Sequence, residues 1–328
     1  MSARMLKTLV FVSTIQLLVA GYAHAGWLSH LFASNGQYAN TKYPIVLVGG
    51  FFAFDSMLGI EYFYGIADDL RKYGANVYET DVSEFHNNEF RGEELLREIE
   101  DYLAITGYEK VNVIAHSQGS ATARYVASAR PDLIASITSV HGMNRGTYMA
   151  DSVRGIIPAG SIQETLLEAV TNFVGGPLWG FISGDEHQQH QSAIEVMNSS
   201  NTEAAQVFNR LHTAGLPSEP CGRKGAHNVN GVRYWSWGGA GGRFGANTNP
   251  LDILDDVLFS VTPYLFPKGV EHDGVVQLCS QYLGKPIRHD YYHNHIDAVN
   301  HFLGVTGVAV KPKTLYRNHA NRLKKAGL

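Results

Sequence analysis

The sequence predicts an α/β fold with a mostly parallel sheet and helices on both of its faces. The segments 44–50 and 111–115 are predicted to be buried strands, because they are mostly apolar and rich in β-branched residues. Strand-like and helix-like segments also alternate along the first half of the chain, which favours parallel pairing. The chain has 328 residues, of which 45% are hydrophobic and 17% are charged. This composition is globular, and we expect one large domain over 26–328.

The predicted elements follow one another in a regular order. We expect strands at 44–50, 75–82, 111–115, 133–140 and 232–237, and helices at 59–73, 93–106 and from 121 to Arg130-Pro131. The helix over 93–106 is amphipathic, and Gly107 is its expected C-cap. The first strand ends in glycines before the hydrophobic loop 51–54, and the strand over 133–140 ends at His141-Gly142. The glycine-rich segment 237–242 reads as a loop without a phosphate-binding role, since no lysine and helix follow it.

Ser117 lies where a buried strand turns sharply into a helix. The pentapeptide Ala115-His116-Ser117-Gln118-Gly119 fits the G-x-S-x-G nucleophile elbow, with Ala115 at the first glycine position. Such a turn would expose the Ser117 hydroxyl above the sheet. The backbone N–H of Gln118 and the helix N-terminus would then face any developing negative charge. The alternative is a tight strand-to-helix turn without a chemical role.

The first 25 residues have the pattern of a signal peptide. Arg4 and Lys7 precede an apolar run over 9–20, and Ala23-His24-Ala25 offers a cleavage site. We therefore expect a mature chain that starts near Gly26 and lies outside the cytoplasm. The alternative is an uncleaved membrane anchor.

The chain has two cysteines, Cys221 and Cys279. In an exported protein such a pair favours a disulfide, which would stabilise a loop of this length by roughly 4 kcal/mol. Two buried free thiols are the alternative. The formal net charge of −4, without a basic stripe, argues against a nucleic-acid partner.

The segment 161–182 combines an amphipathic helix with a helix-breaking Gly175-Gly176-Pro177. Ser161 and Glu164 form a capping box at its start. A helix of this kind can be a lid that opens over an apolar substrate site at an oil surface. An ordinary surface helix packed on the sheet has the same pattern.

A serine nucleophile requires a histidine base and a carboxylate that orients the histidine, in the chain order Ser, acid, His for this type of elbow. The candidates after Ser117 include Asp252, Asp255, Asp256, Asp273, Asp290 and Asp297, and His272, His289, His293, His295, His301 and His319. Asp273 stands at an expected strand-end turn, which suits an acid. The cluster His289, His293, His295 and Asp297 could alternatively bind zinc, although its spacing is not a standard zinc spacing.

Several segments, spread from about Thr41 to the C-terminus, carry a resemblance to a known family. They are 41–47, 91–93, 110–112, His116-Ser117, 124–127, 130–136, 229–232, 272–276, 294–297 and 319–323. On these segments the chain resembles the true lipases of the Pseudomonas and Burkholderia group, a branch of the α/β-hydrolases. The resemblance implies an α/β-hydrolase fold with a helical lid at about 161–182. It also implies a secreted triacylglycerol lipase that passes through the periplasm and acts on lipid esters at an oil–water interface.

The resemblance also assigns roles to single residues. Ser117 matches the nucleophile, Asp273 the triad acid and His295 the general base, while Phe51 and Gln118 match the backbone oxyanion donors. Asp252 and Asp297 match the carboxylates of a structural calcium site, to which the positions of His301 and Val305 contribute backbone carbonyls. Cys221 and Cys279 match the family disulfide. The family further implies a lipase-specific foldase as a partner.

The chain departs from the family at two positions near the expected oxyanion hole. Gly49-Gly50 replaces the usual His-Gly, and the residue after the nucleophile is Gln118 where histidine is common. The second change leaves the backbone N–H in place, whereas the first removes a side chain that orients the loop. Two other functions stay open on the sequence alone: a carboxylesterase or polyester depolymerase with the same triad, and a non-catalytic relative.

Overall fold

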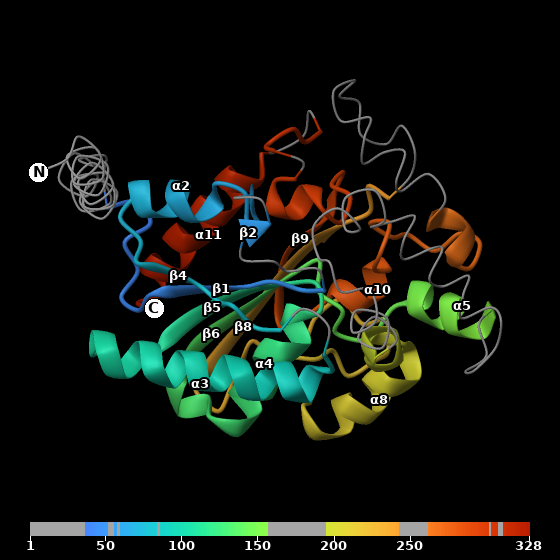
Figure 1. Ribbon diagram of the computed structural model, residues 1–328, viewed down its shortest axis with the longest axis horizontal. Coiled ribbons are helices and arrows are strands. Elements are labelled where there is room, and N and C mark those ends of the chain that lie inside the picture. Colours follow the sequence, from blue (N-terminus) through green and yellow to red (C-terminus); the bar gives the residue numbers. More distant parts are fainter. Residues whose placement is uncertain are drawn as a thin grey trace, which may run out of the picture.

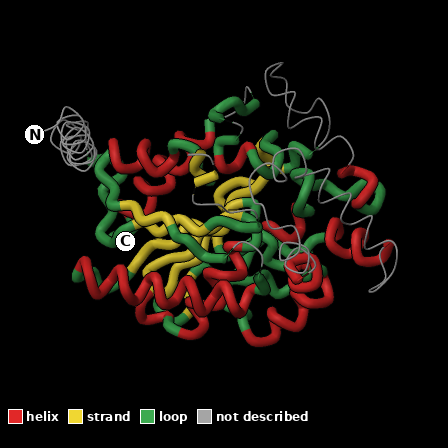
Figure 2. Tube along the Cα trace, in the orientation of Figure 1, coloured by secondary structure: helices red, strands yellow, loops and turns green. Residues whose placement is uncertain are grey.

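A mostly parallel sheet forms the centre of the molecule (Figures 1 and 2). The computed structural model describes residues 37–51, 56–57, 60–83, 86–156, 195–242, 262–301, 303–307 and 311–328. Within these residues the sheet has seven strands in the order β4-β1-β5-β6-β8-β7, and β9 pairs with β8. The strands are β1 (Ile45–Val48), β4 (Val77–Glu79), β5 (Val111–His116), β6 (Ile134–Val140), β7 (Asn228–Val229), β8 (Val232–Gly239) and β9 (Lys285–Tyr291). All pairs are parallel except β7 with β8, which confirms the predicted fold class.

Helices cover both faces of the sheet (Figure 1). Helices α3 (Asn88–Thr106) and α4 (Gly119–Ala129) pack on one face, and α2 (Ile66–Lys72) and α11 (Pro312–Lys325) pack on the other. Strand β1 contributes to the core on both faces, because successive side chains of a strand point to opposite sides of the sheet. Val46 and Val48 lie in the core under α3 and α4, whereas Ile45 and Leu47 lie in the core under α2 and α11. Both cores are buried, as a doubly covered parallel sheet requires.

Smaller elements complete the described part of the chain. Helices α5 (Tyr148–Ile156) and α8 (Thr202–Leu211) lie beyond one end of the sheet in Figure 1, and α10 (Leu278–Gln281) lies between them and the sheet. Strands β2 (Ser56–Met57) and β3 (Ile60–Glu61) form a separate antiparallel pair. Short 3₁₀ turns cover Pro131–Leu133, Thr262–Leu265 and Asp297–Val299. None of the described helices has the length and apolar character needed to cross a membrane.

Several predicted boundaries are wrong. Helix α3 starts at Asn88, five residues before the predicted start, because the Asn87 side chain caps it by accepting the N–H of Phe90 at 2.9 Å. The predicted C-cap Gly107 is confirmed, with a φ of 75°. Helix α2 and strand β4 are shorter than the predicted 59–73 and 75–82.

The predicted loop at 237–242 is also partly wrong, because β8 continues through Gly238 and Gly239. These two glycines gain their strand geometry from parallel pairing with neighbours distant in sequence, which local pattern does not reveal. The predicted signal peptide (1–25) and lid (161–182) lie outside the described residues and stay predictions, as does the single domain over 26–328.

Candidate active site

Ser117 occupies a strained turn between β5 and α4. Its φ is 57°, in the left-handed region that a residue with a side chain rarely adopts. The turn brings α4 close to β1, since a Cβ on Gly119 would lie 2.6 Å from the carbonyl oxygen of Gly49 and 2.7 Å from that of Val48. Only glycine therefore fits two residues after the serine. The fully buried Ala115 fits at the other small position, so the strand, turn and helix expected for a nucleophile elbow are all present.

His295 lies between Ser117 and Asp273. Its Nε2 is 2.9 Å from the Ser117 Oγ, and its Nδ1 is 2.9 Å from the Asp273 Oδ2. The backbone N–H of His295 also donates to the carbonyl of Asp273 at 2.8 Å, which ties the two loops together. The structure thus brings together all three residues that the resemblance assigns to a triad, although they are spread over 178 positions of the sequence.

Asp273 does not follow a strand, contrary to the prediction. It stands in a tight loop that is closed by an isolated bridge between His272 and Gln277. The Asp273 Oδ1 accepts the backbone N–H groups of Val275 at 3.0 Å and Val276 at 2.7 Å. An aspartate that caps its own loop in this way needs no strand to orient it.

The environment of Asp273 keeps this buried carboxylate ionised. Burial alone would raise its pKa, but the neighbouring His295 and the hydrogen bonds from His141 and His295 outweigh burial and hold the pKa well below its usual range. His141 was not among the predicted acid–base candidates. It follows β6, and its Nδ1 is 2.8 Å from the Asp273 Oδ2. The only sequence signal for it is a polar residue at the carboxyl end of a buried strand.

The ligand atoms of His141, Asp273 and His295 lie within 4.8 Å of one another, and among the described residues these side chains form the group that could hold a metal ion. The alternative zinc cluster of His289, His293, His295 and Asp297 is not such a group. His289 instead donates to the carbonyl of Gln281 at 3.4 Å, and burial lowers its pKa to about 3.

The other residues that the sequence offered as acid or base make contacts elsewhere or lie outside the described residues. His319 pairs with Thr138 in the core at 2.6 Å, His272 stacks on Phe266, and Asp290 pairs with Arg288 at the surface. Asp252, Asp255 and Asp256 lie outside the described residues.

The loop after β1 is held by two side chains where the family histidine is absent. The buried Arg91 donates from Nη2 to the carbonyl of Gly49 at 2.7 Å. The N–H of Gly50 donates to the hydroxyl of Tyr62 at 3.1 Å. A Cβ on Gly50 would lie 2.5 Å from the Ser117 Cβ and 3.1 Å from the Gln118 backbone nitrogen, so this loop touches the elbow directly.

Tyr62 also connects this loop to the one that carries His295. Its hydroxyl lies 2.6 Å from the Nδ1 of His116, and the Nε2 of His116 lies 3.0 Å from the carbonyl of His295. Burial lowers the pKa of His116, so the ring is neutral. A neutral ring can accept the Tyr62 proton at Nδ1 and donate from Nε2. The side chain of Phe51, the other expected oxyanion residue, packs against a small apolar cluster of Ala150, Val153, Val196 and Met197.

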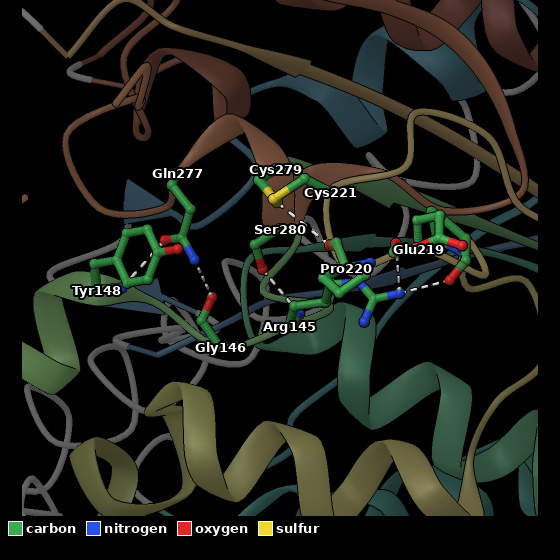
Figure 3. The surroundings of a disulfide bond; sticks show 10 residues. Arg145, Gly146, Tyr148, Glu219, Pro220, Cys221, Gln277, Cys279 and Ser280 are labelled. Carbon is green, nitrogen blue, oxygen red and sulfur yellow. Dashed lines mark hydrogen bonds between the residues drawn. A yellow bond between two sulfur atoms is a disulfide. The ribbon is translucent and has the colours of Figure 1, made fainter. Parts of the chain in front are cut away.

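The predicted disulfide between Cys221 and Cys279 is present and anchors α10 (Figure 3). Next to it, Ser280 accepts the backbone N–H of Arg145 at 2.8 Å, and Gln277 donates to the carbonyl of Gly146 at 3.2 Å. The disulfide therefore ties the segment around Cys221 to α10, while the two hydrogen bonds tie the segment that follows Asp273 to the segment that follows His141.

Part of the predicted calcium site is described. Asp297 is fully buried, and its Oδ2 accepts the N–H of Asn294 at 3.0 Å. The Nε2 of His301 donates to the carbonyl of Glu61 at 2.8 Å, which is compatible with a ligand role for the backbone carbonyl of His301. A buried carboxylate and backbone carbonyls are oxygen donors of the kind that suit calcium. The fourth predicted residue, Asp252, lies outside the described residues.

Comparison with known proteins gives one protein family and several lipases that are similar to this chain. The family described as "alpha/beta hydrolase fold" matches residues 43–262. A triacylglycerol lipase of Vibrio cholerae is 45% identical over 305 residues, which cover 93% of this chain and 94% of that protein. A triacylglycerol lipase of Pseudomonas fragi is 40% identical over 88% of this chain and 98% of its own length. Among solved structures, a mature lipase of Bacillus licheniformis has a TM-score of 0.57 at 14% identity, over 87% of this chain and 93% of that chain, which shows a shared fold.

Proposed function

This chain belongs to the α/β-hydrolase family, as the sequence resemblance indicated, and we propose that it is a triacylglycerol lipase, like its named relatives. It is a carboxylic ester hydrolase, because the named relatives that match nearly its whole length are all triacylglycerol lipases. One geometric observation carries the proposal: the His295 ring joins the Ser117 hydroxyl, which lies on a strained turn, to the buried Asp273 carboxylate.

The proposed reaction follows from these contacts. His295 accepts the Ser117 proton at Nε2 as the Oγ attacks the ester carbonyl. Asp273 stays ionised and stabilises the positive charge that forms on His295. The backbone N–H groups of Phe51 and Gln118 bind the developing oxyanion, a type of contact whose removal typically costs roughly 10²- to 10³-fold in kcat. His295 returns the proton to the leaving alcohol, and water then hydrolyses the acyl-enzyme by the same steps.

The experiment that tests this function compares the wild-type protein with Ser117→Ala. We expect Ser117→Ala to lose hydrolysis of p-nitrophenyl esters and labelling by a fluorophosphonate, while its thermal unfolding is unchanged. Hydrolysis of emulsified triolein alongside short soluble esters would support a lipase. Activity on short soluble esters alone would instead indicate a carboxylesterase, and full activity of Ser117→Ala would refute the nucleophile assignment.

We propose that calcium binds at Asp297 and Asp252, with backbone carbonyls of His301 and Val305. The support is the buried carboxylate of Asp297 on the loop that carries His295. When bound, calcium would supply positive charge that stabilises this loop, and it would take no part in the ester chemistry. Excess chelator should lower the melting temperature of the wild-type protein but not that of Asp297→Asn. An unchanged melting temperature in the wild-type protein would argue against the site.

We also propose that the protein is secreted through the periplasm with the help of a lipase-specific foldase. The signal-peptide pattern of residues 1–25 and the disulfide, which forms in oxidising compartments, support export, and the resemblance to the lipase family supports a foldase. The relatives' lipase names support a lipid ester at an oil–water interface as the substrate. N-terminal sequencing of the exported protein should start near Gly26, and co-expression with a foldase should raise the yield of active enzyme.

A further inference from the structure

The carboxylate of Asp273 accepts hydrogen bonds from two side chains beyond the triad, His141 and Gln281. Its Oδ2 accepts from His295, from the Nδ1 of His141 at 2.8 Å and from the Nε2 of Gln281 at 3.2 Å. Asp273 and His141 are fully buried. A triad needs only one histidine on its acid, so the second histidine calls for an explanation.

Two glycines at the end of β8 make room for these donors. A Cβ on Gly239 would lie 2.9 Å from the Cε1 of His141, and a Cβ on Gly238 would overlap the Oε1 of Gln281. The backbone of Gly239 also fixes the Gln281 amide, donating its N–H to Oε1 at 2.9 Å and accepting from Nε2 at 3.0 Å. This part of the glycine-rich segment therefore shapes the space behind Asp273.

The backbone conformation and the burial of His141 both reduce the stability of the fold. Its φ is 47°, in the left-handed region, and its Nε2 is buried without a hydrogen-bond partner among the described residues. Both features are unfavourable for stability. An apolar side chain would fill the same volume without burying an unpaired ring nitrogen, so packing alone does not account for a histidine. The hydrogen bond to Asp273 does account for it.

We propose that His141 is a positioning residue, which holds the Asp273 carboxylate in the one orientation that His295 requires. This inference rests on the proposed function and concerns the same site. With Asp273 ionised, both histidines donate from Nδ1 to the same oxygen, so neither needs a second proton. When His295 becomes charged during the reaction, the His141 hydrogen bond and the amide of Gln281 keep this oxygen from turning away. The backbone N–H groups of Val275 and Val276 hold the other oxygen.

The test uses a matched pair of variants at residue 141. His141→Asn keeps an N–H donor near the Nδ1 position and tolerates positive φ, whereas His141→Leu has the same shape as Asn but lacks the donor. On a soluble p-nitrophenyl ester we expect His141→Leu to lose about 10- to 100-fold in kcat with little change in KM. His141→Asn should recover most of this loss. His227→Leu serves as a control, because the His227 ring donates to the carbonyl of Tyr234 at 2.9 Å and packs against Trp235, and neither partner belongs to the proposed triad.

A second measurement uses the wild-type protein and does not depend on how the variants fold. Nitrogen-15 spectra of histidine-labelled protein should show His141 as the neutral tautomer with its proton on Nδ1. The Nε2–H tautomer, or a His141→Leu variant with wild-type kcat, would overturn the inference. Both results leave the proposed function intact if the wild-type protein hydrolyses esters and is labelled by a fluorophosphonate. A wild-type protein that does neither would instead refute the proposed function.

Discussion

Substitution of Gly50 by alanine should strongly impair catalysis although the change is a single methyl group. The added Cβ would lie 2.5 Å from the Ser117 Cβ and 2.9 Å from its Oγ, whereas ordinary contacts begin at 3.4 Å. The loop or the nucleophile must therefore move by about 0.9 Å. A misplacement of about 1 Å between reacting groups typically costs roughly 100-fold in rate. We accordingly expect kcat to fall by about two orders of magnitude.

The same overlap should reduce stability moderately. Overpacking of a close-packed site costs about 1–3 kcal/mol, which most folded domains tolerate. The measurements are kcat on a soluble p-nitrophenyl ester and the free energy of unfolding in urea. Gly155→Ala is the matched control, because Gly155 lies on the exposed side of α5 and a Cβ there would meet no atom within 4 Å. It should leave kcat unchanged. A Gly50→Ala enzyme with wild-type kcat would refute the contact between this loop and the nucleophile.

Three further perturbations test the surroundings of the site. Tyr62→Phe removes the oxygen that accepts the Gly50 N–H at 3.1 Å, so kcat should fall about tenfold while the melting temperature changes little; an unchanged kcat would show that Tyr62 does not orient the loop. Replacing Cys221 and Cys279 together by serine opens a crosslink between residues 58 positions apart and should lower the free energy of unfolding by about 4 kcal/mol in urea, and a loss below 1 kcal/mol would argue against the disulfide as a brace. Asp273→Asn tests how the ionisation of Asp273 contributes to stability at different pH. The pKa of Asp273 is lower in the folded protein than the value of about 3.9 in the unfolded chain. The ionised carboxylate therefore contributes its full stabilisation above about pH 3.9, and this contribution is lost as pH falls toward the folded-state pKa. The stability difference between wild type and Asp273→Asn should shrink as pH falls from about 5 to 3, and a constant difference would contradict the assignment.

Local sequence pattern was sufficient for the elbow but not for the rest of the triad. Ser117 stands between a buried strand and a helix with small residues on both sides, and each of these features is local. The proposed acid and base come from loops far along the chain, and several aspartates and histidines follow Ser117, so chain order alone does not select a pair. Only the resemblance to a family selected Asp273 and His295. In the structure Asp273, the proposed acid, lies in a loop that its own side chain caps and does not follow a strand.

The two residues that hold the loop at Gly49 and Gly50 could not be predicted from the spacing of residues in the sequence. Arg91 lies on α3 and Tyr62 lies after β3, and both reach the loop only because the sheet packs those segments against it. The Gly49-Gly50 departure removes a histidine side chain but not the need to fix the loop. Backbone groups of Gly49 and Gly50 are therefore held by hydrogen bonds from outside the loop. Sequence alone locates the missing side chain and gives no indication of what replaces it.

The glycines of β8 show why pattern led to the wrong structure there. Glycine has no side chain to reveal whether a position is buried, so a run of glycines reads as a loop. In the sheet, Gly238 and Gly239 continue a buried strand because β9 supplies hydrogen bonds on one side. Because these glycines have no side chains, they leave space beside Asp273 that His141 and Gln281 occupy. The glycine pair at the carboxyl end of β8 is therefore better interpreted as leaving space for side chains from neighbouring segments, one after β6 and one on α10.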